Sequence, residues 1–250
     1  MTDYQTRNAE TIDRWVEEGW EWGKPIEHET YLDAVNGKWD VLLTPTLPVP
    51  HDWFGALKGK KILGLASGGG QQIPIFAALG AVVTVLDLSD RQLESERLVA
   101  DREGYDVTII KADMTKPLPF PDRAFDLLFH PVSDCYIEEI APLYRECARV
   151  LRQGGVFLGG FDNGINFIVN GDETAIENEM PFNPLKNEAQ MRRLEEDDCG
   201  IQFSHFFGET VSALLKAGFT LTDIYDDYNG EGRLDRLRIP TFFAIRAVKN

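Results

Sequence analysis

A glycine-rich turn directly after a short apolar segment is the feature of this sequence that points most clearly to chemistry. Residues 60–70 read KKILGLASGGG, and residues 71–79 then have a helical pattern. A strand that runs into such a turn and then into a helix brings bare backbone N–H groups to a small ligand. Glycines remove the Cβ atom and allow positive φ, so the ligand can touch the main chain. We therefore expect a ligand-binding site at this turn.

Three kinds of ligand bind at such turns, and the neighbouring residues discriminate between them. A phosphate-binding loop needs a lysine after the glycines, and none follows here. A dinucleotide site needs G-x-G-x-x-G, but Ile73 stands where the third glycine should be. S-adenosylmethionine carries no phosphate; it needs backbone donors, a carboxylate for its ribose and a polar group for its adenine. A nicotinamide-dependent oxidoreductase is kept as the less favoured alternative.

Polar residues follow the next two apolar segments, where S-adenosylmethionine would need groups that bind its ribose and its adenine. Asp87 follows residues 81–86, roughly 20 residues after the turn, where an acid can accept from ribose hydroxyls. Capping of the next helix is the competing role for Asp87, although Ser89 already fills it. Asp113 can accept from an exocyclic amine and Met114 can cover a ring, but a loop aspartate is often only a turn residue. Gln92 either reaches the site or serves only in a capping box with Ser89.

The apolar segments alternate with helical ones, which predicts an α/β fold with right-handed crossovers and a doubly wound, mostly parallel sheet. We expect strands at residues 61–65, 81–86, 106–110, 125–129 and 156–161, followed by two terminal strands at residues 219–225 and 241–248. We expect helices at residues 71–79, 89–103, 136–151 and 206–216, with Gly154-Gly155 ending the third of them.

Two segments differ from this rhythm. We expect residues 1–58 to form an N-terminal helical cap, with a helix at residues 8–18 followed by a connector that contains several prolines. The domain that follows spans residues 59–250. Residues 162–204 are polar and too long for an ordinary loop, so we expect an inserted lid or substrate element.

The amino acid composition limits the classes of partner and the cellular location that we expect. The net charge is −16, from 25 basic and 41 acidic residues, which disfavours nucleic acid and anionic membranes as partners. Three cysteines without a C-x-x-C pattern and four scattered histidines predict neither disulfides nor a metal site. The N-terminus has no signal pattern and no stretch of apolar residues is long enough to span a membrane, so we expect a cytoplasmic protein. The sequence does not predict an oligomeric state.

Five segments together resemble the class I S-adenosylmethionine-dependent methyltransferases: ILGLASGGG, VLDLS, ADM, PFPDRAFDLLF and RVLRQGGVFL. The resemblance implies a Rossmann-like, seven-stranded sheet whose final strand is antiparallel. It also implies cofactor contacts at Ala66, Gly68, Gly70, Asp87, Leu88, Asp113 and Met114. To these we add Ser67, Gln71, Gln92 and His130.

The glycine turn departs from the family pattern at two positions. The family usually has an acid where Gly64 stands and a glycine where Ala66 stands. The acid normally helps to hold the methionine amino group, so Ser67 and the carbonyls near His130 are the candidates to replace it. This departure keeps open a second alternative, a module that binds S-adenosylmethionine as a sensor or has lost activity.

Methyl transfer is an in-line displacement, so the protein mainly supplies positioning and desolvation. A general base is needed only if the acceptor arrives protonated. His130, just past a strand end, is the candidate base, and its competing role is structural. We expect a small-molecule acceptor, bound by Ser133, Asp134, Tyr136, Trp20, Trp22 and Tyr31. Clustered aromatic residues such as those in the cap are more often part of a core, which is their competing role.

Overall fold

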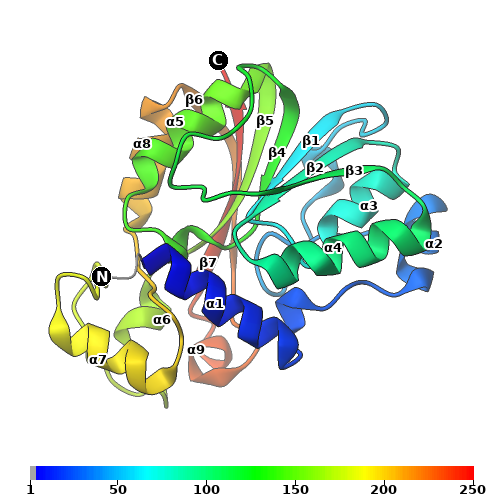
Figure 1. The fold of residues 1–250 in the computed structure, drawn as a ribbon. Helices are drawn as coiled ribbons and strands as arrows, with labels where there is room; N and C mark the ends of the chain where they lie inside the picture. The colour runs from blue at the N-terminus through cyan, green and yellow to red at the C-terminus, as the bar shows by residue number, and fades with distance from the viewer. Residues whose placement is uncertain (1–3) are drawn as a thin grey trace.

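The apolar segments pair into one seven-stranded sheet in the computed structural model, which describes residues 4–250 (Figure 1). The strand order is β3-β2-β1-β4-β5-β7-β6. Strands β1 to β5 are parallel, and β7 is antiparallel to both of its neighbours. The strands are β1 Lys61–Leu65, β2 Val82–Asp87, β3 Val107–Lys111, β4 Phe125–His130, β5 Leu151–Asp162, β6 Phe219–Asp227 and β7 Phe242–Lys249.

Helices cover both faces of this sheet, which confirms the doubly wound architecture (Figure 1). One apolar cluster joins the sheet to α5 (Ile140–Val150) and α8 (Phe207–Lys216). A second cluster joins the other face to α3 (Gln72–Ala78) and α4 (Asp90–Glu103). The remaining helices are α1 Tyr4–Glu17, η1 Glu21–Gly23, α2 His28–Val35, η2 His51–Trp53, η3 Asp134–Tyr136, α6 Ile165–Ile168, α7 Glu188–Asp197 and α9 Gly232–Arg236.

The end of α5 corrects one expectation. The helix stops at Val150, and β5 begins at once with Leu151, so Gly154 and Gly155 lie inside the strand. The β4–β5 register shifts opposite these residues, and Gly154 has φ +71°. A glycine with positive φ at a register shift is typical of a β-bulge. The paired glycines therefore bend a strand; they do not end the helix.

The N-terminal segment packs on the sheet beyond its first helices. Trp53 and Phe54 are buried in the cluster that contains α3. The carbonyl of Leu43 lies so close to Gly160 of β5 that no Cβ would fit there. Residues up to 57 thus share the core of the sheet domain. The boundary at residue 58 stays a prediction about how the chain divides.

Helix α1 lies across the carboxyl ends of the parallel strands, between α7 and α4 (Figure 1). Asn8 is buried and exchanges two hydrogen bonds with Ile201 of the insertion, Nδ2 to the carbonyl at 2.8 Å and Oδ1 to the N–H at 2.6 Å. At the other end Asp13 accepts from the Ser89 hydroxyl at 2.5 Å. Two segments that are distant in the sequence therefore hold this helix over the sheet edge.

The glycine turn carries an unusual backbone conformation. Ala66 has φ +48°, in the left-handed region that favours glycine, and it stands where the family has glycine. Gly69 and Gly70 also have positive φ. A Cβ at Gly64 would collide with the side chain of Ile73. The two departures from the family pattern thus have different consequences, strain at residue 66 and close packing at residue 64.

A buried ion pair lies at the end of β4. The His130 side chain is fully buried; Nδ1 lies 3.0 Å from the Leu65 carbonyl and Nε2 lies 2.6 Å from Oδ1 of Asp134. Burial alone would raise the pKa of Asp134, but the adjacent His130 and the hydroxyl of Tyr144 lower it overall. Both ring nitrogens of His130 are therefore engaged inside the protein, one with the Leu65 carbonyl and one with the Asp134 carboxylate.

We expect Ala66→Gly to raise the free energy of unfolding by about 0.5 kcal/mol. Left-handed backbone costs a non-glycine residue about 1–2 kcal/mol, and the greater freedom of glycine in the unfolded chain offsets about 0.4–1 kcal/mol of that gain. Urea denaturation measures the change. Ala77→Gly in α3 is the control, and it should lose about 1 kcal/mol. A loss at Ala66 as large as that at Ala77 would contradict backbone strain.

We expect Asp134→Asn to lower the free energy of unfolding by about 3 kcal/mol, because it replaces the buried carboxylate that the His130 imidazole and the Tyr144 hydroxyl both contact. Guanidinium denaturation followed by circular dichroism measures the loss. Asp122→Asn is the matched control, since Asp122 pairs with Arg149 at the surface and such pairs are worth less than about 1 kcal/mol. Equal losses in the two variants would show that the buried pair of His130 and Asp134 contributes no more to stability than a surface pair.

Candidate active site

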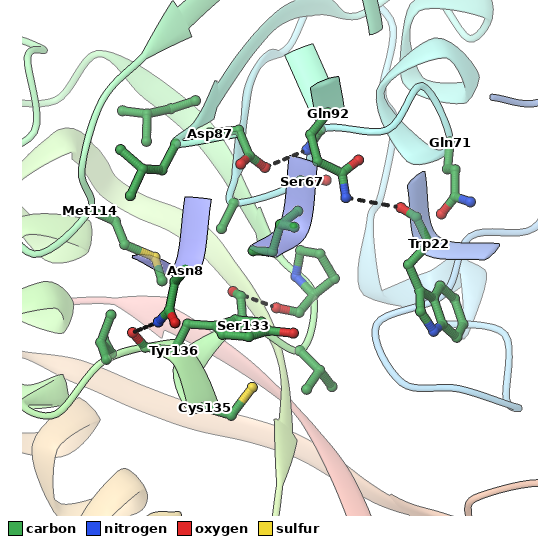
Figure 2. Close-up of a pocket in the computed structure, with 18 of the residues that line it drawn as sticks. Asn8, Trp22, Ser67, Gln71, Asp87, Gln92, Met114, Ser133, Cys135 and Tyr136 are labelled. Atoms are coloured by element: carbon green, nitrogen blue, oxygen red, sulfur yellow. Dashed lines mark hydrogen bonds between the residues drawn. The ribbon is translucent and has the colours of Figure 1, made fainter. Parts of the chain in front are cut away.

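A cavity of about 290 Å³ opens at the carboxyl ends of β1, β2, β3 and β4 (Figure 2). Its walls are the loops that follow these strands, and its roof is α1 with the segments around residues 20–22 and 42–45. Crevices at this edge of an open α/β sheet are where such folds bind ligands. The predicted residues that line the cavity are Ala66, Ser67, Gly68, Gln71, Asp87, Leu88, Gln92, Asp113, Met114, Ser133, Tyr136, Trp20 and Trp22.

Three backbone N–H groups of the turn bond inside the protein, so the turn offers fewer bare donors than expected. The N–H of Ala66 bonds to the Leu86 carbonyl at 2.8 Å. The N–H of Gly68 bonds to Asp87 Oδ2 at 3.0 Å, and the N–H of Gly69 bonds to the Gln92 carbonyl at 2.9 Å. Such a turn offers shape and acceptors but few donors, so it does not suit a phosphate. It does suit a ligand that brings its own N–H and O–H groups.

Asp87 connects the turn to the next loop. Its Oδ2 accepts from Gly68 and its Oδ1 accepts from the N–H of Ser89 at 3.1 Å. Burial raises the pKa of Asp87, and the backbone N–H groups of Ser89, Gly68 and Leu88 oppose that rise. Each carboxylate oxygen keeps a second lone pair for the cavity. Asp87 can therefore accept from ribose hydroxyls while it fixes the turn.

Two buried oxygens at the cavity wall have no partner among the described residues. They are the hydroxyl of Ser67, whose residue is 3% exposed, and Oε1 of Gln92. The Gln92 amide nitrogen donates to the Trp22 carbonyl at 3.3 Å (Figure 2), and its backbone N–H completes the cap at Ser89. A buried polar atom without a partner is costly, so these two atoms indicate a polar ligand.

Asp113 and Met114 form the far wall. Asp113 Oδ1 accepts from the N–H of Thr115 at 2.8 Å, the bond of an ordinary turn residue. Its other oxygen lies 3.9 Å from the Lys116 ammonium. Met114 is partly buried against the core and lines the cavity. The pair keeps the placement expected for an adenine site.

Four predicted site residues do not line the cavity. Asp134 is buried behind it, where its carboxylate contacts Nε2 of His130 and accepts from the Tyr144 hydroxyl. His130 is sealed behind it, and both of its ring nitrogens are occupied, so the prediction that it acts as a base or contacts the cofactor is corrected. Gly70 lies behind the turn, where a Cβ would meet the Ser95 carbonyl at 2.7 Å. Tyr31 stacks on Tyr105 with centroids 5.8 Å apart, outside the cavity.

Gln71 lines the cavity, but its amide donates to the carbonyls of Glu21 and Lys24 at 2.7 and 3.0 Å. The side chain therefore holds the segment with Trp20 and Trp22 against the turn. Sequence reasoning missed the roof and one end of the cavity: Asn8, Ala9, Ile12, Leu42, Leu43, Thr44, Pro45, Cys135 and Phe242. No local signal marks them, because long-range packing brings them to the sheet edge.

The residues present fit S-adenosylmethionine. Asp87 lines the cavity, and two buried oxygens beside it, those of Ser67 and Gln92, lack partners among the described residues. A Cβ at Gly68 would meet Asp87 Oδ2 at 3.1 Å and overlap Gln92, so glycine is needed for the approach. An acid at residue 64 would meet Ile73. Among residues 4–250, no group of His, Cys, Asp or Glu is arranged to hold a metal ion.

Comparisons with known proteins agree with this geometry. A methyltransferase-domain family matches residues 63–159. The uncharacterized methyltransferase YbaJ of Bacillus subtilis is 35% identical over the full length of both chains. A sterol 24-C-methyltransferase of Gibberella zeae is 31% identical over 42% of this chain and 28% of its own length.

Solved structures agree as well. An S-adenosylmethionine-dependent methyltransferase from Mesorhizobium loti superposes with a TM-score of 0.63 at 22% identity, covering 79% of this chain and 94% of that chain. A geranyl diphosphate methyltransferase in complex with S-adenosylmethionine superposes with a TM-score of 0.56 at 16% identity, covering 80% and 82%. These structures share the fold. In this chain the final strand is antiparallel, as expected from the sequence.

The family assignment favours a methyltransferase over both alternatives, the nicotinamide-dependent oxidoreductase and the inactive binding module. The sheet order, the cavity and the full-length relative lead to the same enzyme class. The chain belongs to the S-adenosylmethionine-dependent methyltransferases.

Proposed function

We propose that this methyltransferase acts on a small molecule that is uncharged and largely apolar. The composition of the cavity beyond the cofactor loops carries the proposal. Its charged lining residues, Asp87 and Asp113, both follow the strands at the cofactor end. The lining elsewhere is mostly apolar: Ile12, Leu42, Leu43, Pro45, Pro131, Val132 and Phe242. A charged acceptor would lose its hydration there without gaining a partner.

The same lining supports transfer without a general base. Burial raises the pKa of Cys135 and of Tyr136 well above their ordinary values, so both stay protonated near neutral pH. The His130 ring lies outside the cavity lining, and both of its nitrogens contact groups inside the protein. The acceptor must therefore bring a nucleophile that attacks without losing a proton to the enzyme.

The cofactor, when bound, supplies a methyl group on a sulfonium sulfur, which is an activated leaving group. The chain's own residues hold the two reactants in line and exclude water. Ser67, Asp87 and Gln92 would hold the cofactor, and Trp20, Ser133 and Tyr136 would line the acceptor space. Ser133 donates its hydroxyl to the Pro131 carbonyl at 2.9 Å, so its oxygen stays available as an acceptor.

We also propose that the partner is a small molecule and that the protein is cytoplasmic, as expected from the sequence. The net charge of −16 supports a small molecule over nucleic acid. Within residues 4–250, none of the helices has the length and apolar character that a membrane span requires. The three cysteines are free thiols, which suits the reducing cytoplasm.

We expect Ser67→Ala to weaken binding of S-adenosylhomocysteine about fivefold, since one hydrogen bond is worth about 1 kcal/mol. Calorimetric titration measures the affinity. Ser212→Ala on α8, on the opposite face of the sheet from α4, is the matched control and should leave it unchanged. Unchanged affinity in Ser67→Ala would remove this hydroxyl from the cofactor site.

We expect 1-hexanol to bind the complex with S-adenosylhomocysteine at least tenfold more tightly than hexanoate at pH 8. The two probes share an apolar body, and only hexanoate must bury a charge. Calorimetry on the preformed complex measures both. Equal affinity for the two probes, or no binding of 1-hexanol, would overturn the proposed acceptor class.

A further inference from the structure

A buried carboxylate outside the cofactor site lies at the end of β6. Asp227 is the last residue of this strand and is fully buried. Its Oδ2 accepts from the N–H groups of Thr46 and Leu47 at 2.8 and 3.1 Å. Its Oδ1 accepts from the Thr46 hydroxyl, and also from the N–H of Tyr228 at 2.8 Å. The side chain of Asp227 therefore holds a segment that is distant in the sequence.

The segment that Asp227 holds is part of the cavity roof. Residues 42–45 line the cavity, and Thr46 and Leu47 follow them directly. Leu42 pairs with Pro48 in an isolated antiparallel bridge, so residues 42–48 form a closed loop. The bonds of Asp227 thus reach this loop immediately beside the residues that face the ligand space.

Asp227 also contacts a second part of the lining through its backbone. The ladder between β6 and β7 pairs Asp227 with Phe242, which lines the cavity. The Asp227 carbonyl accepts from the N–H of Thr241 at 3.1 Å. One residue therefore joins the 42–48 loop to the start of β7, and so connects lining residues from the two ends of the chain.

Hydrogen-bond donors stabilise the charge of this carboxylate. Burial would raise the pKa of Asp227, but the hydrogen bonds from Thr46 and Tyr228 lower it overall. The side chain is accordingly charged at neutral pH, and hydrogen bonds to a charged acceptor are stronger than those between neutral groups. Removal of the carboxylate would leave the N–H groups of Thr46 and Leu47 without their acceptor.

The residues that Asp227 holds belong to the apolar end of the cavity. Asp87 and Asp113 follow the strands at the cofactor end, whereas residues 42–45 and Phe242 belong to the largely apolar lining elsewhere. Asp227 is not part of the lining itself. Its effect on a ligand must therefore act through the position of the 42–48 loop.

We propose that Asp227 is a positioning residue for the acceptor: its carboxylate holds the 42–48 loop against the start of β7 and so fixes the apolar end of the cavity before the acceptor enters. This inference rests on the proposed function, which assigns that end of the cavity to the acceptor. Without the bonds of Asp227, the acceptor has to order the loop when it binds, and this cost lowers its affinity.

The test compares the wild-type protein with Asp227→Asn, which keeps the shape but replaces one acceptor oxygen with a donor. The affinity for 1-hexanol, measured by calorimetry on the preformed complex with S-adenosylhomocysteine, should fall about tenfold, as expected for the loss of a charge-assisted hydrogen bond. The affinity for S-adenosylhomocysteine itself should change less than about twofold, because the cofactor end is separate from the loop. Equal losses for both ligands, or no loss for 1-hexanol, overturn the proposal.

Variants of Thr46 separate the bond from the change in charge. Thr46→Val keeps the shape and removes the hydroxyl donor, so it should weaken binding of 1-hexanol, whereas Thr46→Ser should retain the wild-type affinity. Thr46→Val should add little to the effect of Asp227→Asn, because both remove the same bond. Fully additive losses in the double variant contradict the proposal.

Asp226→Asn is the matched control for net charge. Asp226 is exposed and precedes Asp227 in β6, so its side chain points to the other face of the sheet. Both affinities should stay at their wild-type values in this variant. A loss of 1-hexanol affinity as large as that in Asp227→Asn would show that net charge, and not the contact with the loop, controls binding.

Hydrogen exchange followed by NMR gives a readout that needs no acceptor. The N–H of Val49 bonds to the Val41 carbonyl at 3.0 Å, at the base of the 42–48 loop. It should exchange faster in Asp227→Asn, while the N–H of Gly69 in the glycine turn keeps its rate. Failure of 1-hexanol to bind the wild-type complex overturns the proposed acceptor class. Unchanged exchange at Val49, or equal acceleration at Gly69, overturns the role of Asp227.

Discussion

Three backbone N–H groups of the glycine turn, those of Ala66, Gly68 and Gly69, bond to the protein itself, and this constraint limits what the turn can bind. Strand β2 takes the N–H of Ala66, and Asp87 takes that of Gly68. Helix α4 takes the N–H of Gly69 through the Gln92 carbonyl. A turn fixed in this way cannot wrap an anion with its amides, as a phosphate loop does. It presents acceptors and a surface without side chains, which suits an amino acid ligand with an ammonium and a ribose.

The fixed conformation of the turn helps to explain its two departures from the family pattern, at residues 64 and 66. The side chain of Ile73 occupies the space that an acid at residue 64 would need. Ala66 holds a left-handed conformation in place of glycine, and its N–H bond to Leu86 is part of what keeps it there. The buried hydroxyl of Ser67 lies next to both. The turn therefore replaces a charged anchor with close packing and one unpaired hydroxyl.

The central part of the fold could be predicted from sequence because its signals are local. A β-branched run such as residues 82–86 predicts a buried strand, and Ser89 predicts the start of α4, where it accepts from the N–H of Gln92. The helix end expected at Gly154 was wrong, because glycine pairs end helices and form bulges equally well, and the pairing of β5 with β4 decides between the two.

The site could be predicted only where it belongs to those local motifs. Asp87 and Asp113 follow strands and lie at the cavity as expected. His130 also follows a strand, yet its side chain turns inward to Asp134, four residues later, a choice that depends on the burial of Tyr144. Asn8 and Phe242 come from the two ends of the chain, and no spacing in the sequence relates them to the glycine turn.

The cavity roof is held less firmly than its wall. Helix α1 is joined to the insertion by the buried bonds of Asn8 and by ion pairs of Arg7 and Arg14 that are largely exposed. Exposed pairs contribute less than about 1 kcal/mol each, and a few hydrogen bonds contribute about 1 kcal/mol apiece. The turn, by contrast, is bonded at successive residues and packed against α4 without space for a Cβ. Main-chain bonds and close packing thus fix the cofactor wall, whereas side-chain bonds to the insertion and to α4 hold the roof.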